Sequence, residues 1–111
     1  MIAQREIWLA PFPFSDQLGM KVRPVVVISN DQFNANSEDI LVMGMTSQFS
    51  KGKYAVSVSP LDDEEKSLHH QGYIKVENVL KLSQKLVYKK IGRLNKDKFQ
   101  QAIQLFEMII H

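Results

Sequence analysis

Arg23-Pro24-Val25-Val26-Val27-Ile28-Ser29 carries, behind its proline, a continuous apolar run of mostly β-branched residues. Such a run is typical of a strand buried on both faces, so we expect it at the centre of a sheet. A second run, Ile40-Leu41-Val42-Met43-Gly44-Met45, predicts another strand, which closes at Thr46-Ser47. Working outward from these two segments, the sequence indicates a small protein built mainly from strands.

The remaining elements are short and are separated by turn signals. Asn30 or Asp31 is expected to cap a short helical piece, and Asn95 a closing helix. We expect strands at 5–10, 23–29, 40–45, 54–59, 72–77 and 86–91, the first ended by Pro11-Phe12-Pro13 and the last by Gly92. The apolar stripe of the closing helix consists of Phe99, Ala102, Ile103, Phe106, Ile109 and Ile110. The fold class is therefore mostly β with a C-terminal helix, a twisted antiparallel sheet that closes toward a small barrel.

Length and composition place the chain among ordinary globular proteins. Its 111 residues suit a single domain spanning 1–111, and its 44% hydrophobic and 23% charged residues exclude a disordered or fibrous chain. There is no cysteine, so disulfides, thiol nucleophiles and thiolate metal sites are excluded. Arg5 and Glu6 interrupt the N-terminal apolar stretch, and no run is long enough to span a bilayer. We therefore expect a cytoplasmic protein with no membrane contact.

Charge is unevenly distributed, although its formal sum is only +2. The last third carries Lys81, Lys85, Lys89, Lys90, Arg93, Lys96 and Lys98. These cations fit either ordinary solvated surface or a stripe that binds phosphates. Asp62-Asp63-Glu64-Glu65 forms a single acidic block, which we interpret as a solvated loop.

Arg23, Thr46 and Ser47 place a permanent cation and two hydroxyls at the ends of two strands. A guanidinium holds two phosphate oxygens at once, and preorganised donors stabilise charge where it develops. Hydroxyls donate to phosphate oxygens, although at a turn they more often satisfy their own backbone. This combination suits a phosphodiester under attack, so RNA is the expected substrate.

Lys75 and Glu77 lie two residues apart on an expected strand and therefore face the same way, together with Tyr73. They fit either an acid and base pair or a surface salt bridge. His69 and His70 are adjacent and their rings point apart, so we expect no metal site and no cofactor. His70 remains a further candidate for the general base. The aromatic pair Phe12 and Phe14, on an expected exposed loop, offers a stacking surface for unpaired bases.

Four segments, in this order, resemble the MazF/PemK family of toxins. They are Glu6-Ile7-Trp8-Leu9, Arg23-Pro24, Thr46-Ser47 and Ile91-Gly92-Arg93-Leu94, so the resemblance extends from about Arg5 to the C-terminus. It implies the SH3-like small barrel of the CcdB/MazF-type toxins and a homodimer whose subunits together form an RNA groove. It also implies a metal-independent endoribonuclease that attacks through the 2′-hydroxyl of single-stranded mRNA, leaving a cyclic phosphate and a 5′-hydroxyl, and that is held inactive by a cognate antitoxin.

The resemblance assigns catalysis to Arg23 and Thr46, with Lys75 and Glu77 as acid and base candidates. RNA-binding candidates are Ser47, Gln17, Lys21, Phe14, Tyr73, Asn78 and Lys81. Two departures affect base recognition. The strongest family motif reads Asp-Gln and then Arg-Thr where this chain has Glu77-Asn78-Val79-Leu80-Lys81, and Gln17 stands where some members have histidine. Two other functions stay open: a CcdB-like gyrase-binding toxin, and an RNA-binding relative whose catalysis has decayed.

Overall fold

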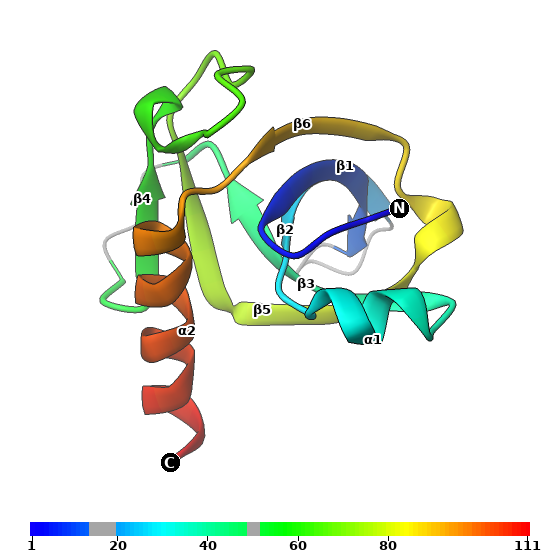
Figure 1. The fold of residues 1–111 in the computed structure, drawn as a ribbon. Coiled ribbons are helices and arrows are strands. Elements are labelled where there is room, and N and C mark those ends of the chain that lie inside the picture. Colours follow the sequence, from blue (N-terminus) through cyan, green and yellow to red (C-terminus); the bar gives the residue numbers. More distant parts are fainter. Residues whose placement is uncertain (14–19, 49–51) are drawn as a thin grey trace.

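The computed structural model describes residues 1–13, 20–48 and 52–111, drawn as a ribbon in Figure 1. In chain order the elements are β1 (Glu6–Pro13), β2 (Met20–Val27), α1 (Asp31–Ala35), β3 (Asp39–Thr46), β4 (Ala55–Val58), η1 (Pro60–Asp62), β5 (Gly72–Ser83), η2 (Gln84–Leu86), β6 (Lys89–Arg93) and α2 (Lys96–Ile110). Here η marks a 3₁₀ helix. Asn30 caps α1 and Asn95 caps α2, each accepting a hydrogen bond from a backbone N–H of the first turn, as predicted.

One antiparallel sheet contains all six strands in the order β4-β5-β3-β2-β1-β6. β2 lies between β3 and β1, and Val25, Val26 and Val27 are fully buried. The expectation of a central strand covered on both faces is therefore confirmed. Burying each of these side chains stabilises the fold by about 1.5–3 kcal/mol. β2 is therefore a main contributor to the stability of the sheet.

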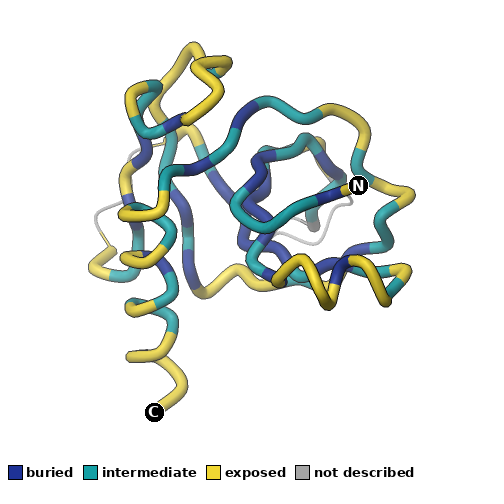
Figure 2. The backbone as a smooth tube through the Cα atoms, viewed as in Figure 1, coloured by how far each residue is buried: buried dark blue, intermediate teal, exposed yellow. Residues whose placement is uncertain are grey.

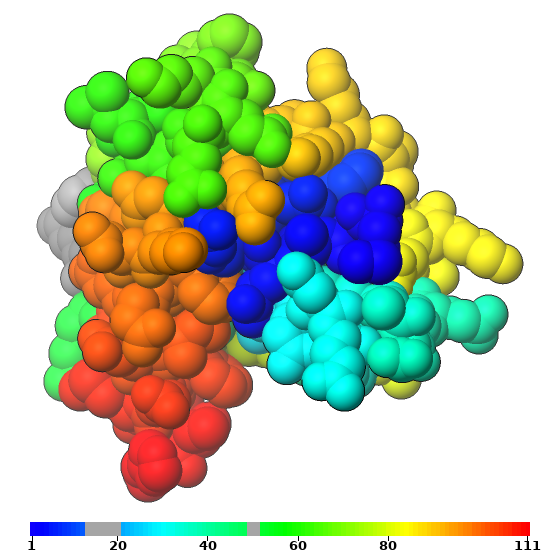
Figure 3. All heavy atoms as spheres, in the orientation of Figure 1, coloured from blue at the N-terminus to red at the C-terminus, as the bar shows by residue number. Residues whose placement is uncertain are grey.

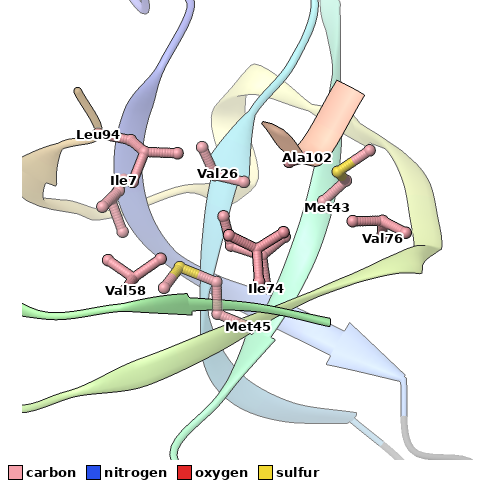
Figure 4. Packing of buried hydrophobic residues seen from close by; sticks show 10 residues of the cluster. Ile7, Val26, Met43, Met45, Val58, Ile74, Val76, Leu94 and Ala102 are labelled. Carbon is pink, nitrogen blue, oxygen red and sulfur yellow. The ribbon is translucent and has the colours of Figure 1, made fainter. Parts of the chain in front are cut away.

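The sheet curls because its two faces enclose two core clusters. The first, shown in Figure 4, gathers Ile7 and Val26 with Met43, Ile74, Leu94 and Ala102 of α2. The second gathers Ala10, Val25, Val27, Ile40, Val42 and Leu82. Along β2, successive valines belong to different clusters, as the alternation of a strand requires. Each face of β2 can therefore be assigned by the cluster that its residues join.

β1 extends through Pro13, so the prediction that Pro11-Phe12-Pro13 ends the first strand is wrong. The reason lies in the pairing. β6 pairs with β1 only as far as Leu9, whereas β2 continues to pair through Pro13. Beyond Leu9, β1 pairs with β2 alone among the strands of the described residues, and a missing N–H costs no ladder bond on the side without a partner. Phe12 consequently lies in a strand opposite Lys21 and packs on the second cluster, not on an exposed loop.

Several strand boundaries also differ from the predictions. β2 begins at Met20, β5 continues to Ser83 instead of ending at Glu77, and Leu86 belongs to η2. Gly92 lies within β6, opposite Ile7, instead of ending it. β5 is long because it pairs with β3 at both of its ends, over 73–74 and 79–83, and with β4 over 72–75. The register with β3 shifts between Met43 and Met45, where the sheet bends.

Helix α2 lies beside β4 and β5 and completes the first cluster (Figure 1). Ala102 is buried, and Phe99, Ile103, Leu105 and Phe106 pack around it. The predicted stripe ends there, because Ile109 and Ile110 are exposed; the last turn of α2 extends beyond the sheet in Figure 2. Leu105, absent from the predicted stripe, takes part in the packing instead.

The two ends of the sheet are joined outside the strands. Asp63, which follows β4 and η1, forms an isolated antiparallel bridge with Leu94, which follows β6. Glu64 N–H donates to the Arg93 carbonyl at 2.7 Å and Asn95 N–H to the Asp62 carbonyl at 2.8 Å. The space-filling view shows this contact as green atoms of the segment after β4 lying on the orange residues between β6 and α2 (Figure 3). The curled sheet is thereby closed into a half-barrel.

Candidate functional site

Arg23 and Thr46 leave the same face of neighbouring strands. Val25 of β2 pairs with Gly44 of β3 at the end of the β2–β3 ladder. Arg23 precedes Val25 by two residues and Thr46 follows Gly44 by two, so both side chains share the face of that pair, and the same register brings them opposite each other. Arg23 is half-buried in mid-strand, opposite Ala10 of β1, and not at an exposed strand start as predicted. We call this surface the Arg23 face.

Thr46 is half-buried at the end of β3 and Ser47 beyond it is exposed. The Oγ1 atom of Thr46 accepts a hydrogen bond from the N–H of Gln48 at 3.2 Å. This is the local turn contact that the sequence left as an alternative. A hydroxyl has two lone pairs and one proton, so accepting from Gln48 leaves the Thr46 proton available to donate to a phosphate oxygen.

Tyr73, Lys75 and Glu77 continue the Arg23 face along β5. Tyr73 pairs with Thr46 on one side and with Ser57 on the other, so it shares the face of Thr46. Ile74 and Val76, on the opposite face, are buried in the core. The Nζ atom of Lys75 lies 3.7 Å from Oε2 of Glu77, so the two form the surface salt bridge that the sequence allowed. This pair is largely exposed and lies further along the strand from Thr46.

The other predicted RNA-binding residues are spread over the sheet. Lys21 is exposed and lies two residues before Arg23 on the same face. Asn78 lies in the part of β5 where the register with β3 shifts. Lys81 pairs opposite Leu41, about 15 Å along β3 from Thr46, and its Nζ is 3.9 Å from Asp39, so the structure does not bring it to Arg23. Gln17 and Phe14 lie outside the described residues.

A cavity of about 710 Å³ opens on the other face of the same strands. Leu9 and Pro24 line it, and their alternation places them with Ile7 and Val26, opposite to Arg23. Its lining comprises Leu9, Pro24, Met45, Thr46, Ser47, Ser67–Gly72 and Lys89–Ile91. Thr46 and Ser47 therefore lie where the cavity meets the Arg23 face. The sequence singled out His70 here, but neither its pattern nor its spacing indicated a cavity.

Lys90, at the edge of the cavity, is engaged by two carboxylates. Its Nζ lies 2.6 Å from Oε2 of Glu65 and 3.1 Å from Oε2 of Glu6, and the hydrogen bond with Glu65, ahead of that with Glu6, raises the pKa of Lys90 above its usual value. Burial raises the pKa of Glu6, but hydrogen bonds from Ala3 N–H, the Trp8 indole and Lys90 outweigh it and lower the pKa overall. Lys90 is thus a structural cation, whereas its neighbour Lys89 is exposed.

The acidic block, residues 62–65, is not a solvated loop as we expected. Asp62 accepts hydrogen bonds from Ser59, the N-cap of η1, and from Asn95, and Asp63 is buried. Glu64 lies 3.0 Å from Arg5 Nη1 and 3.7 Å from Arg93 Nε, while Glu65 binds Lys90. We call residues 62–65 the acidic clasp, because all four carboxylates bind the ends of β1 and β6 or the turns beside them. These partners lie up to 60 residues away in sequence, which local patterning does not reveal.

Within residues 1–13, 20–48 and 52–111, no three histidine, cysteine, aspartate or glutamate side chains gather as metal ligands do. The same residues contain no helix that is long and apolar enough to cross a membrane.

Comparison with known proteins matches nearly the whole chain to one family. Residues 3–109 match PemK-like, MazF-like toxins of type II toxin–antitoxin systems. A mycobacterial endoribonuclease solved with its cognate antitoxin superposes with a TM-score of 0.79 at 14% identity, covering 99% of this chain and 95% of that one. The toxin MazF-mt6 of Mycobacterium tuberculosis gives 0.76 at 15%, covering 96% of each chain. MazF of Deinococcus radiodurans gives 0.75 at 16%, covering 99% and 96%. The predicted fold class is confirmed, and the chain belongs to the PemK-like, MazF-like toxin family of type II toxin–antitoxin systems.

Proposed function

We propose that this toxin is a metal-independent endoribonuclease that cleaves single-stranded RNA, mRNA in the cytoplasm. The observation that carries the proposal is the position of Arg23 and Thr46, each two residues beyond the Val25–Gly44 pair, on one face of adjacent strands. A guanidinium and a hydroxyl set across a rigid ladder are able to contact one phosphate, because neighbouring strands lie about 5 Å apart. The mycobacterial relative with the same fold is an endoribonuclease, which supports this assignment.

In the proposed reaction the ribose 2′-oxygen attacks the adjacent phosphorus and the bond to the 5′-oxygen breaks. The products are a 2′,3′-cyclic phosphate and a free 5′-hydroxyl, so water is not the attacking group. A base takes the proton of the 2′-hydroxyl, and an acid gives a proton to the leaving 5′-oxygen. Arg23 stabilises the negative charge that grows on the phosphorane, and the hydroxyl of Thr46 donates a hydrogen bond to a phosphate oxygen. Lys75 and Glu77 are the proposed acid and base, although their mutual salt bridge must open for either to act.

The surrounding residues are proposed to bind the RNA strand. Lys21 and Ser47 are placed to contact phosphates beside Arg23 and Thr46, and Tyr73, next to Thr46, offers an aromatic face to a base. Asn78 is proposed to contact the strand further along β5. We also propose that the protein acts as a homodimer and is neutralised by a cognate antitoxin; a relative of the same fold was solved with one.

Incubating the purified protein with end-labelled single-stranded RNA in excess EDTA tests this function. Cleavage should occur in chelator, and the 3′ ends should resist labelling at a free hydroxyl until the cyclic phosphate is removed. RNA in which the nucleotide 5′ to the cut carries a 2′-deoxy sugar should stay intact. Binding without any cleavage would instead identify a relative that has lost catalysis, and inhibition of gyrase supercoiling without RNA cleavage would identify a gyrase-binding toxin.

A further inference from the structure

Asp63 is a buried carboxylate to which the proposed reaction gives no part. Only 2% of its surface is exposed, yet four backbone N–H groups donate to its two oxygens. Oδ1 accepts from Arg93 at 2.7 Å and from Glu65 at 2.9 Å, and Oδ2 accepts from Ser67 at 2.6 Å and from Leu68 at 2.9 Å. Burial raises the pKa of Asp63, but these four hydrogen bonds outweigh it and lower the pKa overall. The group is therefore ionised at neutral pH.

These hydrogen bonds fix one turn of the chain in relation to β6. Three donors, from Glu65, Ser67 and Leu68, belong to the turn that follows Asp63, and the fourth belongs to the last residue of β6. Gly92, the residue before Arg93, has to be a glycine, because a Cβ at this position would lie 2.9 Å from the carboxylate atoms of Asp63. A single side chain thus sets both the shape of the turn and its distance from the sheet.

The turn leads directly into the wall of the cavity. Ser67, Leu68, His69, His70, Gln71 and Gly72 all line it, together with Leu9 of β1, Pro24 of β2 and the last residues of β3. Gly72 begins β5 and would bring a Cβ within 3.3 Å of the Thr46 carbonyl, so the wall ends in contact with the proposed catalytic strand. The next residue, Tyr73, pairs with Thr46.

We propose that Asp63 is a positioning residue of the RNA site, which holds residues 67–72 as the wall beside Thr46 and Ser47. This inference rests on the proposed function, because it assigns that wall to the binding of RNA. The wall carries Leu68 and two histidines, and Lys89 lines the same cavity, so apolar, imidazole and ammonium groups surround the RNA strand as it leaves Thr46. Asp63 itself touches no substrate; it acts only through the backbone of the turn.

Asp63→Asn tests the inference. It replaces one carboxylate oxygen, which accepts two hydrogen bonds, by an amide nitrogen, which accepts none. Glu64→Gln is the matched control: the same charge is removed one residue away, from a side chain whose ion pairs are with Arg5 and Arg93 and not with the amides of the turn. We expect Asp63→Asn to raise the KM for a short single-stranded RNA about tenfold while kcat falls less than threefold. A merely structural role would lower the active fraction, and so kcat, at unchanged KM. Glu64→Gln should keep the KM within twofold.

Amide hydrogen exchange in the RNA-free protein gives a readout that does not depend on cleavage. Ser67 and Leu68 should exchange at least tenfold faster in Asp63→Asn, with β2 and β3 unchanged. Unchanged exchange or an unchanged KM overturns the inference. Wild-type protein that neither binds nor cuts RNA overturns the proposed function and, with it, the assignment of the wall to RNA, while exchange still reports whether Asp63 holds the turn. If Asp63→Asn does not fold, Gly92→Ala, which displaces the charged carboxylate, is judged by the same two readouts.

Discussion

The Arg23 face and the acidic clasp both consist of charged or polar residues on the curled sheet, but they are held in different ways. Positions on the Arg23 face are set by strand register: Arg23 follows from its pairing with Ala10, and Thr46 from its pairing with Tyr73. The clasp is set by its side chains, whose carboxylates bind backbone amides or cations of β1 and β6. Side chains on the Arg23 face are thus replaceable without loss of the fold, whereas those of the clasp are part of it.

Arg23→Ala is expected to have the largest effect on function. Removing a donor that stabilises developing charge should lower kcat by about 10²–10³-fold. Arg23→Lys should recover only part of this, because an ammonium lacks the planar fork. Initial rates on a fluorogenic RNA measure both.

Lys96→Ala provides the control for charge, because Lys96 is an exposed cation at the start of α2, far along the chain from β2. Its rate should match the wild type. If Arg23→Ala cuts as fast as Lys96→Ala, the Arg23 face is not the reaction site.

Gly92→Ala should be the most damaging change to stability at the clasp. The added Cβ would lie 2.9 Å from the Asp63 carboxylate, so the carboxylate has to shift and its four hydrogen bonds are weakened. We expect a loss of about 2 kcal/mol in the free energy of unfolding, measured with urea. A loss below about 0.5 kcal/mol would mean that the clasp is free to adjust.

Much of the fold follows from local sequence patterns. The burial of β2 and both helix caps depend on neighbours within one element, and these predictions were correct. The continuation of β1 through its prolines depends on where β6 stops pairing, and the role of the acidic block depends on contacts with Arg5 and Arg93. Such contacts join residues some 30 to 90 positions apart, so periodicity and spacing do not contain them.

The candidate site divides in the same way. Arg23 and Thr46 stand at strand positions that the apolar runs reveal, and the structure brings them to one face. The cavity next to them was not predicted, because its wall comes from the turn that Asp63 holds, which has no repeating pattern. Lys81 was placed in the site by the resemblance and by its place among the cations of the last third of the chain, and the long β5 takes it away from Arg23.

Acidification should destabilise the clasp before it affects the ladder. Folding lowers the pKa of Asp63 from 3.8 and that of Glu6 from 4.5. In this pH range the folded protein therefore binds fewer protons than the unfolded chain, and both groups stabilise the fold at pH values above 3.8 and 4.5. That stability is lost as the pH falls below about 4.5 and through the lowered folded pKa values. The charged groups around them are Glu64, Glu65, Lys90 and Arg93. Urea titrations from pH 7 to pH 3 should show a smaller loss for Asp63→Asn than for the wild type; equal losses would contradict the role given to Asp63.

Gly44→Ala would create an equally close contact, 2.9 Å, next to the Arg23 face, so it is the counterpart of Gly92→Ala at the acidic clasp. Its Cβ would lie 2.9 Å from Cζ of Phe12, the far end of a side chain on a strand that lacks one neighbour at that point. Phe12 is able to turn aside, so the stability loss should stay below about 1 kcal/mol. Because Gly44 pairs with Val25 just before Arg23 and Thr46, we expect RNA cleavage to fall several-fold all the same. A variant with full activity and lower stability would reverse the distinction between the two regions.

The smallest stability effect should come from the Lys75 and Glu77 pair, and for this reason it isolates chemistry from folding. The two side chains are 38% and 46% exposed and 3.7 Å apart, so a double-mutant cycle of Lys75→Met and Glu77→Gln should give a coupling below about 0.5 kcal/mol in unfolding. If the pair supplies the acid and base, each single change should nonetheless slow cleavage at least tenfold and remove one limb of the pH–rate profile. If cleavage keeps its rate and profile, the two residues form a surface salt bridge and nothing more, and the proton transfers belong to other groups around Thr46, with His70 in the cavity wall as the next to replace.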